Sequence, residues 1–321
     1  MATYDLDRTE LNHLLTPNID PAARAAVVDY LLNNGSFADD DDDGHGHGHG
    51  HDHDDNGHGH DDDDHGSHHA DPDATVNVEI SDGTLPLDPN AQVLDLTSAT
   101  NVVTTDAALK VIVENVAGDA DLTVNGTNDV MIVTGGGNDH VSLQDSGNDV
   151  VMTGRGNDVV HGGGGHDSIY GGGGNDSLVA GSGDHQLLVG GDGNDTLWGG
   201  DGAFDTLMGG NGKDILHAGN GDHQLLIGGN GSDTMYAGTG GDTLQGGGGN
   251  DVFHIDNHLG NDTVDGGGGH DSIDFGSRAS TDIASLHTSH GETVIQFTDG
   301  QTVTVTHVEN LVFTDGTHHL P

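Results

Sequence analysis

Aspartate residues recur every nine or ten positions through the second half of this chain. Each follows a glycine-rich run and precedes an aliphatic residue by two positions. Residues 162–170 (GGGGHDSIY) and 171–179 (GGGGNDSLV) show the unit most clearly. Glycines allow main-chain carbonyls to converge on one point, and each unit adds a carboxylate. Ca²⁺ is held by oxygens of these two kinds, so the unit predicts a series of calcium sites.

The same unit predicts the elements that position these carboxylates. Six residues form a tight turn, and three form a short strand with one inward-pointing side chain. The residue two positions after the sixth is apolar in every unit, as at Met131, Leu187 and Leu225. The sixth residues are Asp129, Asp139, Asp149, Asp158, Asp167, Asp176, His185, Asp195, Asp205, Asp214, His223, Asp233, Asp242, Asp251, Asp262 and Asp271.

Two units form one coil of about eighteen residues, so alternate turns lie on opposite edges of a flattened right-handed roll. One edge has only carboxylates: Asp139, Asp158, Asp176, Asp195, Asp214, Asp233, Asp251 and Asp271. The other edge contains His185 and His223, and imidazole is a poor calcium ligand. We therefore predict a continuous calcium edge and an interrupted one, on which the neighbouring Asp184 and Asp222 compensate only in part.

These units resemble the RTX (repeats-in-toxin), or haemolysin-type, calcium-binding repeats of secreted bacterial proteins. The resemblance implies a parallel β-roll that folds only on binding Ca²⁺, and export by a type I exporter that reads an uncleaved C-terminal signal. Residues 308–316 (VENLVFTDG) resemble the tails of such proteins. With the loop carbonyls, the calcium ligands would be Asp139, Asp149, Asp158, Asp167, Asp176, Asp195, Asp205, Asp214, Asp233, Asp242, Asp251, Asp262 and Asp271.

The composition excludes several classes of partner. The 54 acidic residues against six basic ones give a formal charge of −48, which repels nucleic acid and anionic membranes. There is no cysteine, so disulfides and thiol chemistry are excluded. The sequence has no apolar run long enough to span a membrane and no recognisable signal peptide at its N-terminus. Few aromatic residues and abundant glycine argue against a conventional core but suit a stacked repeat.

The expected fold is all-β, a right-handed parallel β-roll (solenoid) over residues 125–274. Residues 1–37 are predicted as a short helical hairpin, with Asp7 and Asp20 near its helix starts. Residues 38–73 are predicted as a disordered linker rich in His, Asp and Gly. Residues 74–124 are expected to form N-terminal β coils or a cap without metal turns. Residues 275–321 are expected to form a C-terminal β cap with a hairpin turn at Asp299 and Gly300.

The linker is a second candidate metal-binding segment. Neutral imidazole beside carboxylate suits Zn²⁺, Ni²⁺ or Cu²⁺ rather than Ca²⁺. Two interpretations stay open: a solubilising linker whose metal affinity is incidental, or a segment for transition-metal capture or metal-bridged assembly. The candidate ligands are His45, His47, His49, His51, His53, His58, His60, His65, His68 and His69.

No catalytic motif is found. A zinc-protease His-Glu-x-x-His helix and a Gly-x-Ser-x-Gly elbow are both missing, and the loop at Lys213 departs from the phosphate-loop pattern. We therefore expect no enzyme. The leading hypothesis is a secreted calcium-binding β-roll with a structural, adhesive or surface-matrix role, acting by self-assembly or with a cell-surface partner. The alternatives are a transition-metal buffer working through the histidine tract and, ranked lower, an accessory module of a secreted enzyme.

Overall fold

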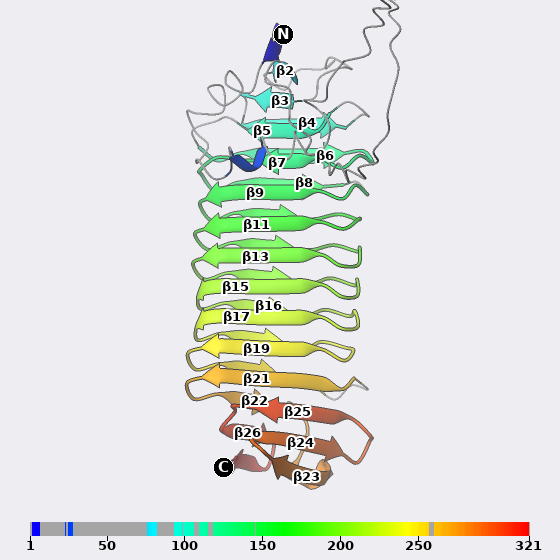
Figure 1. Cartoon of the computed structure of the whole chain (residues 1–321), viewed down its shortest axis with the longest axis vertical. Helices are drawn as coiled ribbons and strands as arrows, with labels where there is room; N and C mark the ends of the chain where they lie inside the picture. The colour runs from blue at the N-terminus through cyan, green and yellow to red at the C-terminus, as the bar shows by residue number, and fades with distance from the viewer. Residues whose placement is uncertain are drawn as a thin grey trace, which may run out of the picture.

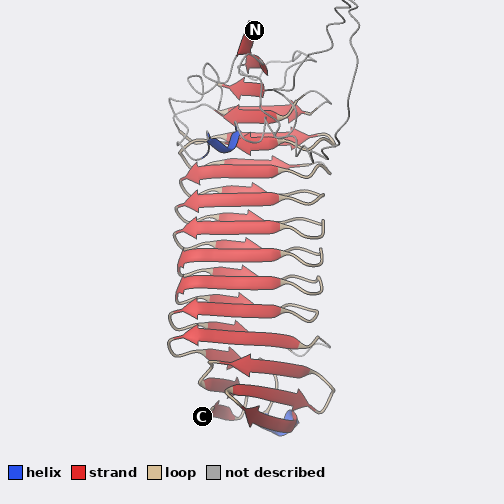
Figure 2. Ribbon diagram, in the orientation of Figure 1, coloured by secondary structure: helices blue, strands red, loops and turns tan. Residues whose placement is uncertain are grey.

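Two β-sheets run along the long axis of the molecule and face each other across a narrow apolar core (Figure 1, Figure 2). The computed structural model describes residues 2–6, 23, 25–27, 76–81, 93–97, 99–105, 109–114, 118–144, 146–256 and 260–320. Successive coils add one strand to each sheet, so most neighbouring strands are parallel. The chain is therefore a parallel β-solenoid whose last strands are antiparallel.

The first sheet, here sheet A, has 15 strands within the described residues. In spatial order they are β1 (Ala2–Leu6), β2 (Val76–Ser81), β3 (Val93–Leu96), β5 (Val111–Glu114), β7 (Met131–Val133), β9 (Val150–Arg155), β11 (Ser168–Gly173), β13 (Leu187–Asp192), β15 (Thr206–Gly212), β17 (Leu225–Gly231), β19 (Thr243–Gly248), β21 (Asp262–Gly268), β25 (Thr302–Thr306), β24 (Glu292–Phe297) and β23 (Ile283–Ser289).

The second sheet, here sheet B, has 12 strands in the part of the chain that the structure describes. In spatial order they are β27 (Gly316–His319), β26 (Asn310–Phe313), β22 (Ser272–Asp274), β20 (Val252–His254), β18 (Thr234–Tyr236), β16 (Ile215–His217), β14 (Thr196–Trp198), β12 (Ser177–Val179), β10 (Val159–His161), β8 (His140–Leu143), β6 (Asp121–Asn125) and β4 (Thr100–Thr104). One 3-10 turn, η1 (Ser280–Asp282), precedes β23.

One aliphatic residue per strand points into the core, as the repeat predicts. In sheet A, Ile169 pairs with Leu188, and Leu188 pairs with Leu207. All three are fully buried. Side chains of a parallel pair in register lie one above another, so each coil buries its aliphatic residues against those of its neighbours. This stacking provides a continuous core although each coil is too small to have one of its own.

The sequence-predicted register was wrong by one residue at three positions. Leu188 and Leu226 are fully buried, whereas Leu187 and Leu225 are half-buried on the outside of sheet A. Gln186 and Gln224, rather than His185 and His223, therefore follow the turns. At the third position Ile132 aligns with Val151, so Val130 rather than Asp129 occupies the equivalent site, and Ile132 rather than Met131 is the inward residue.

An extra residue in three turns explains the shift at the histidines. The turns before Gln186, Asp205 and Gln224 hold one residue more than the standard turn. Each contains a residue with a left-handed backbone: His185 (φ 59°), Phe204 (φ 63°) or His223 (φ 63°). The sequence alone did not reveal the insertion, since both adjacent residues, Leu187 and Leu188 for example, are apolar.

The N-terminal part differs from the predicted helical segment. β1 is a strand that pairs antiparallel with β2, with Ala2 opposite Ile80. A strand forms here because the edge of sheet A otherwise presents unpaired backbone groups. Residues 23 and 25–27 are helical, and the rest of the predicted hairpin, with the linker 38–73, lies outside the described residues. From β2 to β6 the chain already forms coils of the same two sheets.

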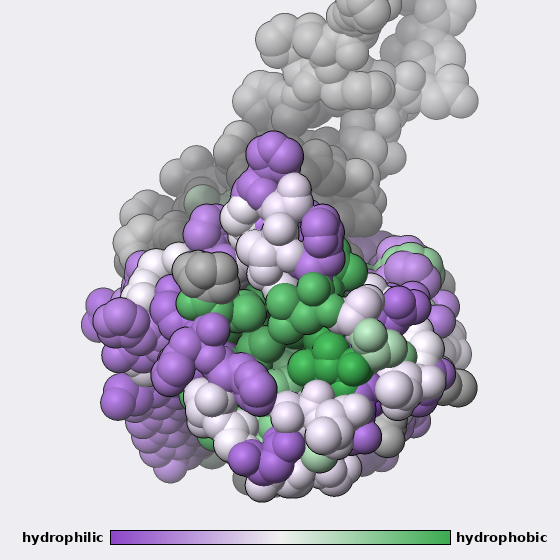
Figure 3. Space-filling model, turned by 90° about the horizontal axis from the view of Figure 1, so that it is seen from below, coloured by the Kyte–Doolittle hydropathy of each residue, from purple (hydrophilic) through white to green (hydrophobic). Residues whose placement is uncertain are grey.

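The C-terminal strands close the solenoid. β24 and β25 form the predicted antiparallel hairpin, β25 pairs in parallel with β21, and β26 pairs in parallel with β22. Phe275 packs between Phe297 and Phe313, with ring centroids 5.1 and 4.9 Å apart. Viewed from this end, apolar residues gather at the centre and polar residues surround them (Figure 3). Among the described residues, no helix has the length and apolar character needed to cross a membrane.

Candidate functional site

The predicted aspartates form a hydrogen-bonded ladder along each edge of the solenoid. On the first edge, the backbone N–H of Asp176 donates to Oδ1 of Asp195 at 2.8 Å, and Asp195 donates in the same way to Asp214. Partners are 18 to 20 residues apart, one coil. The first edge contains the eight predicted residues in unbroken order: Asp139, Asp158, Asp176, Asp195, Asp214, Asp233, Asp251 and Asp271.

The second carboxylate oxygen, Oδ2, of most of these residues lies beside the glycine five positions earlier in the chain. A methyl group added to Gly171 would lie 2.3 Å from Oδ2 of Asp176 and 2.9 Å from the carbonyl oxygen of Gly190, one coil further on. Glycine thus leaves open a cradle between a carboxylate oxygen and a main-chain carbonyl. The same cradle recurs at Gly190, Gly209, Gly228 and Gly246, beside Asp195, Asp214, Asp233 and Asp251.

These oxygens are buried and lack a hydrogen-bond partner. Asp176 is 3% exposed, and Asp195, Asp214, Asp233 and Asp251 are each 1% exposed. Among the residues that the structure describes, no donor bonds Oδ2 of any of the five. A buried carboxylate oxygen without a donor is costly unless a cation neutralises it. The possible metal ligands here are one carboxylate oxygen and main-chain carbonyl oxygens, which are the kinds of ligand that Ca²⁺ prefers.

The pKa values express the same cost. Burial raises the pKa of Asp176, Asp195 and Asp214 to about 6. The hydrogen bond that each carboxylate accepts from a backbone N–H one coil earlier lowers the pKa, but by less than burial raises it. On the second edge, burial raises the pKa of Asp205 to about 6 and that of Asp242 to about 7. The ionised carboxylates therefore destabilise the metal-free fold at neutral pH, and a bound cation would reverse this effect.

Glutamine interrupts the ladder on the second edge. Oε1 of Gln186 accepts the N–H of Asp167, and Oε1 of Gln224 accepts that of Asp205. The amide nitrogen of Gln186 then donates to the carbonyl of Gly165 at 2.8 Å, and Gln224 donates to Gly202. A neutral amide therefore bonds both the backbone N–H and the loop carbonyl. At Gln186 and Gln224 there is therefore no buried charge that a cation would have to neutralise.

Threonine has a similar role at the start of the first edge. Thr153 stands in register with Gly171, and its hydroxyl donates to the Gly171 carbonyl at 2.9 Å. Thr134 donates to the carbonyl of Thr153 at 3.0 Å. Asp139 and Asp158 are thus on the ladder as predicted, but a side chain fills the place of the glycine cradle.

The remaining predicted aspartates are also at ladder positions. Oδ1 of Asp149 accepts the N–H of Val130, Oδ1 of Asp167 that of Asp149, and Oδ1 of Asp262 that of Asp242. Asp184 and Asp222 belong instead to an exposed outer row, where Oδ1 of Asp184 accepts the N–H of Ala203. The histidine tract lies outside the described residues. Within them, no three His, Asp or Glu side chains converge on one point, so a bound ion would depend on main-chain carbonyls.

The sequence interpretation missed Gln186 and Gln224. No signal in the sequence distinguishes them from His185 and His223, because both candidate positions have an apolar residue two positions later. The structure decides between the two positions, since the N–H of Asp167 donates to Oε1 of Gln186, 19 residues further along the chain.

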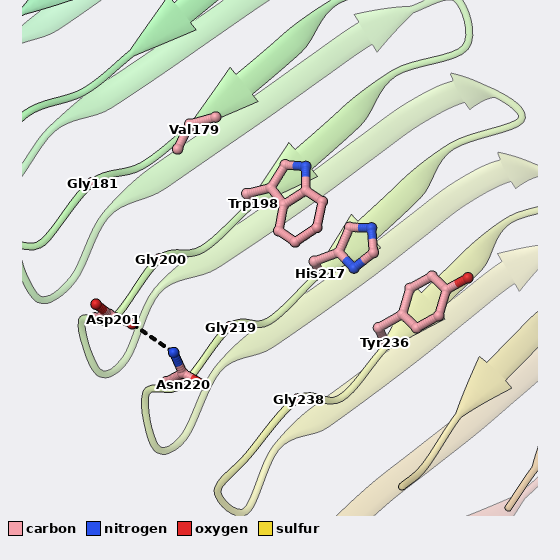
Figure 4. Close-up of a pocket in the computed structure, with 10 residues that line it drawn as sticks. All are labelled: Val179, Gly181, Trp198, Gly200, Asp201, His217, Gly219, Asn220, Tyr236 and Gly238. Carbon is pink, nitrogen blue, oxygen red and sulfur yellow. Dashed lines mark hydrogen bonds between the residues drawn. The ribbon is translucent and has the colours of Figure 1, made fainter. Parts of the chain in front are cut away.

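The outer face of sheet B has a second feature that the repeat does not require. Trp198, His217 and Tyr236 stack with ring centroids 3.6 and 4.4 Å apart, and His254 continues the column at 4.4 Å. Beside them a groove of about 540 Å³ runs across β12 to β18 and is bordered by Asp201 and Asn220 (Figure 4). Trp198 is 44% exposed. This column places aromatic surface on an otherwise strongly acidic molecule.

Comparison with known families agrees with the geometry. The RTX calcium-binding nonapeptide repeat matches residues 144–178, 180–203, 204–222, 227–255 and 259–277. A search of curated proteins gives no match for this chain. The matched segments contain all five glycine cradles and Gln186, whereas Gln224 lies between two of the segments. Residues 144–277 of this chain are therefore RTX calcium-binding nonapeptide repeats, folded as a β-roll with aspartate ladders.

Proposed function

We propose that this protein is a secreted structural or adhesive β-roll that folds when it binds Ca²⁺ outside the cell. The observation that carries the proposal is the row of buried, unpartnered Oδ2 atoms on the first edge, each beside a main-chain carbonyl of the next coil. Because an ion there contacts two coils at once, its binding free energy contributes directly to folding.

We also propose that the two edges bind calcium unequally. The first edge has five glycine cradles between coils, whereas Gln186 and Gln224 bond the loop carbonyls of the second edge. This retains the predicted difference between the edges but assigns the interruption to glutamine instead of histidine. Calcium would thus join neighbouring coils mainly along the first edge of the roll.

Secretion and a non-catalytic role are part of the proposal. Proteins with RTX repeats are typically secreted, and a chain whose ladders stay ionised without calcium would remain unfolded in a calcium-poor cytosol. The column of Trp198, His217 and Tyr236 favours an adhesive role, because exposed aromatic patches on a charged surface mark interaction sites.

A calcium titration of the full-length protein tests the folding proposal. Circular dichroism reports β content, and Trp198, the single tryptophan, reports the middle of the roll by fluorescence. We expect both signals to be those of an unfolded chain in EGTA and to change together as Ca²⁺ is added. Full β content in EGTA at neutral pH would refute the proposal.

A charge-only variant links the transition to the ladder. Asp195→Asn keeps an oxygen that can accept the Asp176 N–H but loses the negative charge, and should shift the transition to higher calcium. Asp201→Asn changes an exposed carboxylate whose Oδ1 accepts the Asn220 amide, and is the matched control. Equal shifts in the two variants would argue against a ladder-specific effect.

The histidine tract supports the alternative, a transition-metal buffer, by composition alone. A zinc titration separates the two functions. Deleting residues 38–73 should abolish zinc binding and leave the calcium transition unchanged if the roll is the working part. Loss of the calcium transition in the deletion variant would indicate that the histidine tract, rather than the roll, is the working part.

A further inference from the structure

The first-edge ladder continues past the last repeat into the C-terminal cap. The backbone N–H of Asp271 donates to Oε2 of Glu309 at 2.7 Å, as each earlier aspartate donates to the next. Glu309 is 38 residues from Asp271 in the chain. It also lies outside the matched repeats, which end at residue 277. The fold therefore places a carboxylate at the next ladder position where the sequence repeat has none.

The glycine cradle is repeated at this junction. A methyl group added to Gly266 would lie 2.7 Å from Oδ2 of Asp271 and 2.0 Å from the carbonyl oxygen of His307. In the five preceding cradles the carbonyl belongs to a glycine of the next coil. His307 adopts a left-handed backbone (φ 49°) and presents its carbonyl in that place.

Asp271 is positioned to bind an ion here. It is fully buried, and no donor among the described residues bonds its Oδ2. The cap thus supplies a carbonyl from His307 and a carboxylate from Glu309 beside a buried carboxylate oxygen that has no protein partner. These carbonyl and carboxylate oxygens are the same kinds of metal ligand as in the cradles between coils.

The second edge ends differently in the same cap. There the amide of Gln301 donates to Oδ2 of Asp262 at 3.3 Å, and the guanidinium of Arg278 bonds both Gln301 and Asp299. Arg278 also lies over the ring of Phe297, 4.0 Å from its centroid. A protein cation thus closes the second edge. On the first edge the N–H of Asp271 bonds Glu309, and among the described residues no Lys or Arg side chain bonds either carboxylate.

We propose that Asp271, the main-chain carbonyl of His307 and Glu309 form a calcium site that joins the cap to the roll. The site rests on the proposed calcium function and adds a specific consequence. Docking of β25 and β26 becomes calcium-dependent, although neither strand belongs to a repeat. Calcium would then complete the end of the roll as well as join its coils.

The test combines calcium stoichiometry with hydrogen exchange on the full-length protein. Glu309→Gln keeps an oxygen for the Asp271 N–H and removes the charge. Glu292→Gln, at an exposed position on the neighbouring strand β24, is the matched control. We expect Glu309→Gln to bind one Ca²⁺ fewer, or to need at least tenfold more for the last ion. Amides of residues 302–320 should then lose calcium-induced protection while those of 168–254 retain it.

A second pair of variants tests the space rather than the charge. Gly266→Ala places a methyl group in the cradle, whereas in Gly268→Ala the nearest atom to the new methyl is 3.9 Å away. Loss of one ion in Gly266→Ala alone supports the site. Wild-type stoichiometry and cap protection in both Glu309→Gln and Gly266→Ala would overturn it. Failure of the proposed function is distinct, because the unmodified protein would then bind no calcium.

Discussion

Substituting the first glycine of one turn should remove a single calcium site from the middle of the roll. In Gly171→Ala the new methyl group would lie between Oδ2 of Asp176 and the carbonyl of Gly190, 2.3 and 2.9 Å from these atoms. Calcium–oxygen distances are about 2.3–2.6 Å, so an ion and the methyl group cannot share this space. Gly171 does not have a left-handed backbone, so alanine meets no φ penalty there.

The magnitude follows from linkage. An ion present at about 100 times its dissociation constant stabilises the native state by about 2.7 kcal/mol. Loss of one such site should therefore lower the free energy of unfolding by about 3 kcal/mol in excess calcium. Gly173→Ala, in the same strand, meets nothing within 4 Å and should change it by less than about 1 kcal/mol.

The assay is urea unfolding, followed by Trp198 fluorescence over a series of free calcium concentrations. The dependence of the free energy of unfolding on the logarithm of calcium concentration gives the number of ions released on unfolding. We expect that number to fall by one in Gly171→Ala and to stay constant in Gly173→Ala. A steric effect alone would lower stability without changing the number. Equal numbers in both variants would refute the assignment of the cradle as a metal site.

Three further predictions concern the rest of the ladder and the cap. Gln186→Asp with Gln224→Asp removes the amide donors to the loop carbonyls of Gly165 and Gly202, so the roll should lose about 1–3 kcal/mol per site in EGTA and bind additional calcium. An unchanged calcium count by isothermal titration would contradict the role given to the glutamines. In EGTA, β content measured by circular dichroism should increase as pH falls from 8 to 5. Because the pKa values of the ladder carboxyls are raised in the folded state, their protonated forms stabilise the fold below about pH 4, and this stability is lost as pH rises through about 6. Constant β content between pH 8 and 5 would contradict this prediction. The carboxyls concerned are Asp158, Asp176, Asp195, Asp205, Asp214 and Asp251. Arg278→Met leaves Asp299 and Gln301 without their cation and should destabilise the cap by about 3 kcal/mol, because Arg278 is buried and Asp299 is one-third exposed. Hydrogen exchange of β24 and β25 measures this, and protection equal to the unmodified protein would show that the ion pair is dispensable.

Much of the fold could be predicted because the sequence repeats. A unit with one inward aliphatic residue and one glycine turn leaves few ways to stack, so the parallel solenoid and the carboxylate ladder follow from spacing. The strands Glu292–Phe297, Thr302–Thr306 and Asn310–Phe313 were also predictable, since they alternate apolar and polar residues.

The exact register could not be obtained where two apolar residues are adjacent. Leu187 and Leu188 satisfy the pattern equally well, and only the pairing of Leu188 with Ile169 distinguishes them. A register shift of one residue matters for the chemistry, because it replaces an imidazole with an amide at the ladder position. The left-handed His185 that accommodates the insertion has no signature in local sequence.

The sequence by itself determined the repeat, the ligand chemistry of the turns and the identity of the calcium-edge aspartates, because these properties are local and recur at fixed spacing. Only the tertiary structure decided how the ladders end. Glu309 meets Asp271, and Arg278 with Gln301 closes the other edge, through contacts between segments about 20 to 40 residues apart that follow no period. Such pairings depend on how the cap strands dock onto the last coil, and that docking is a property of the folded chain as a whole.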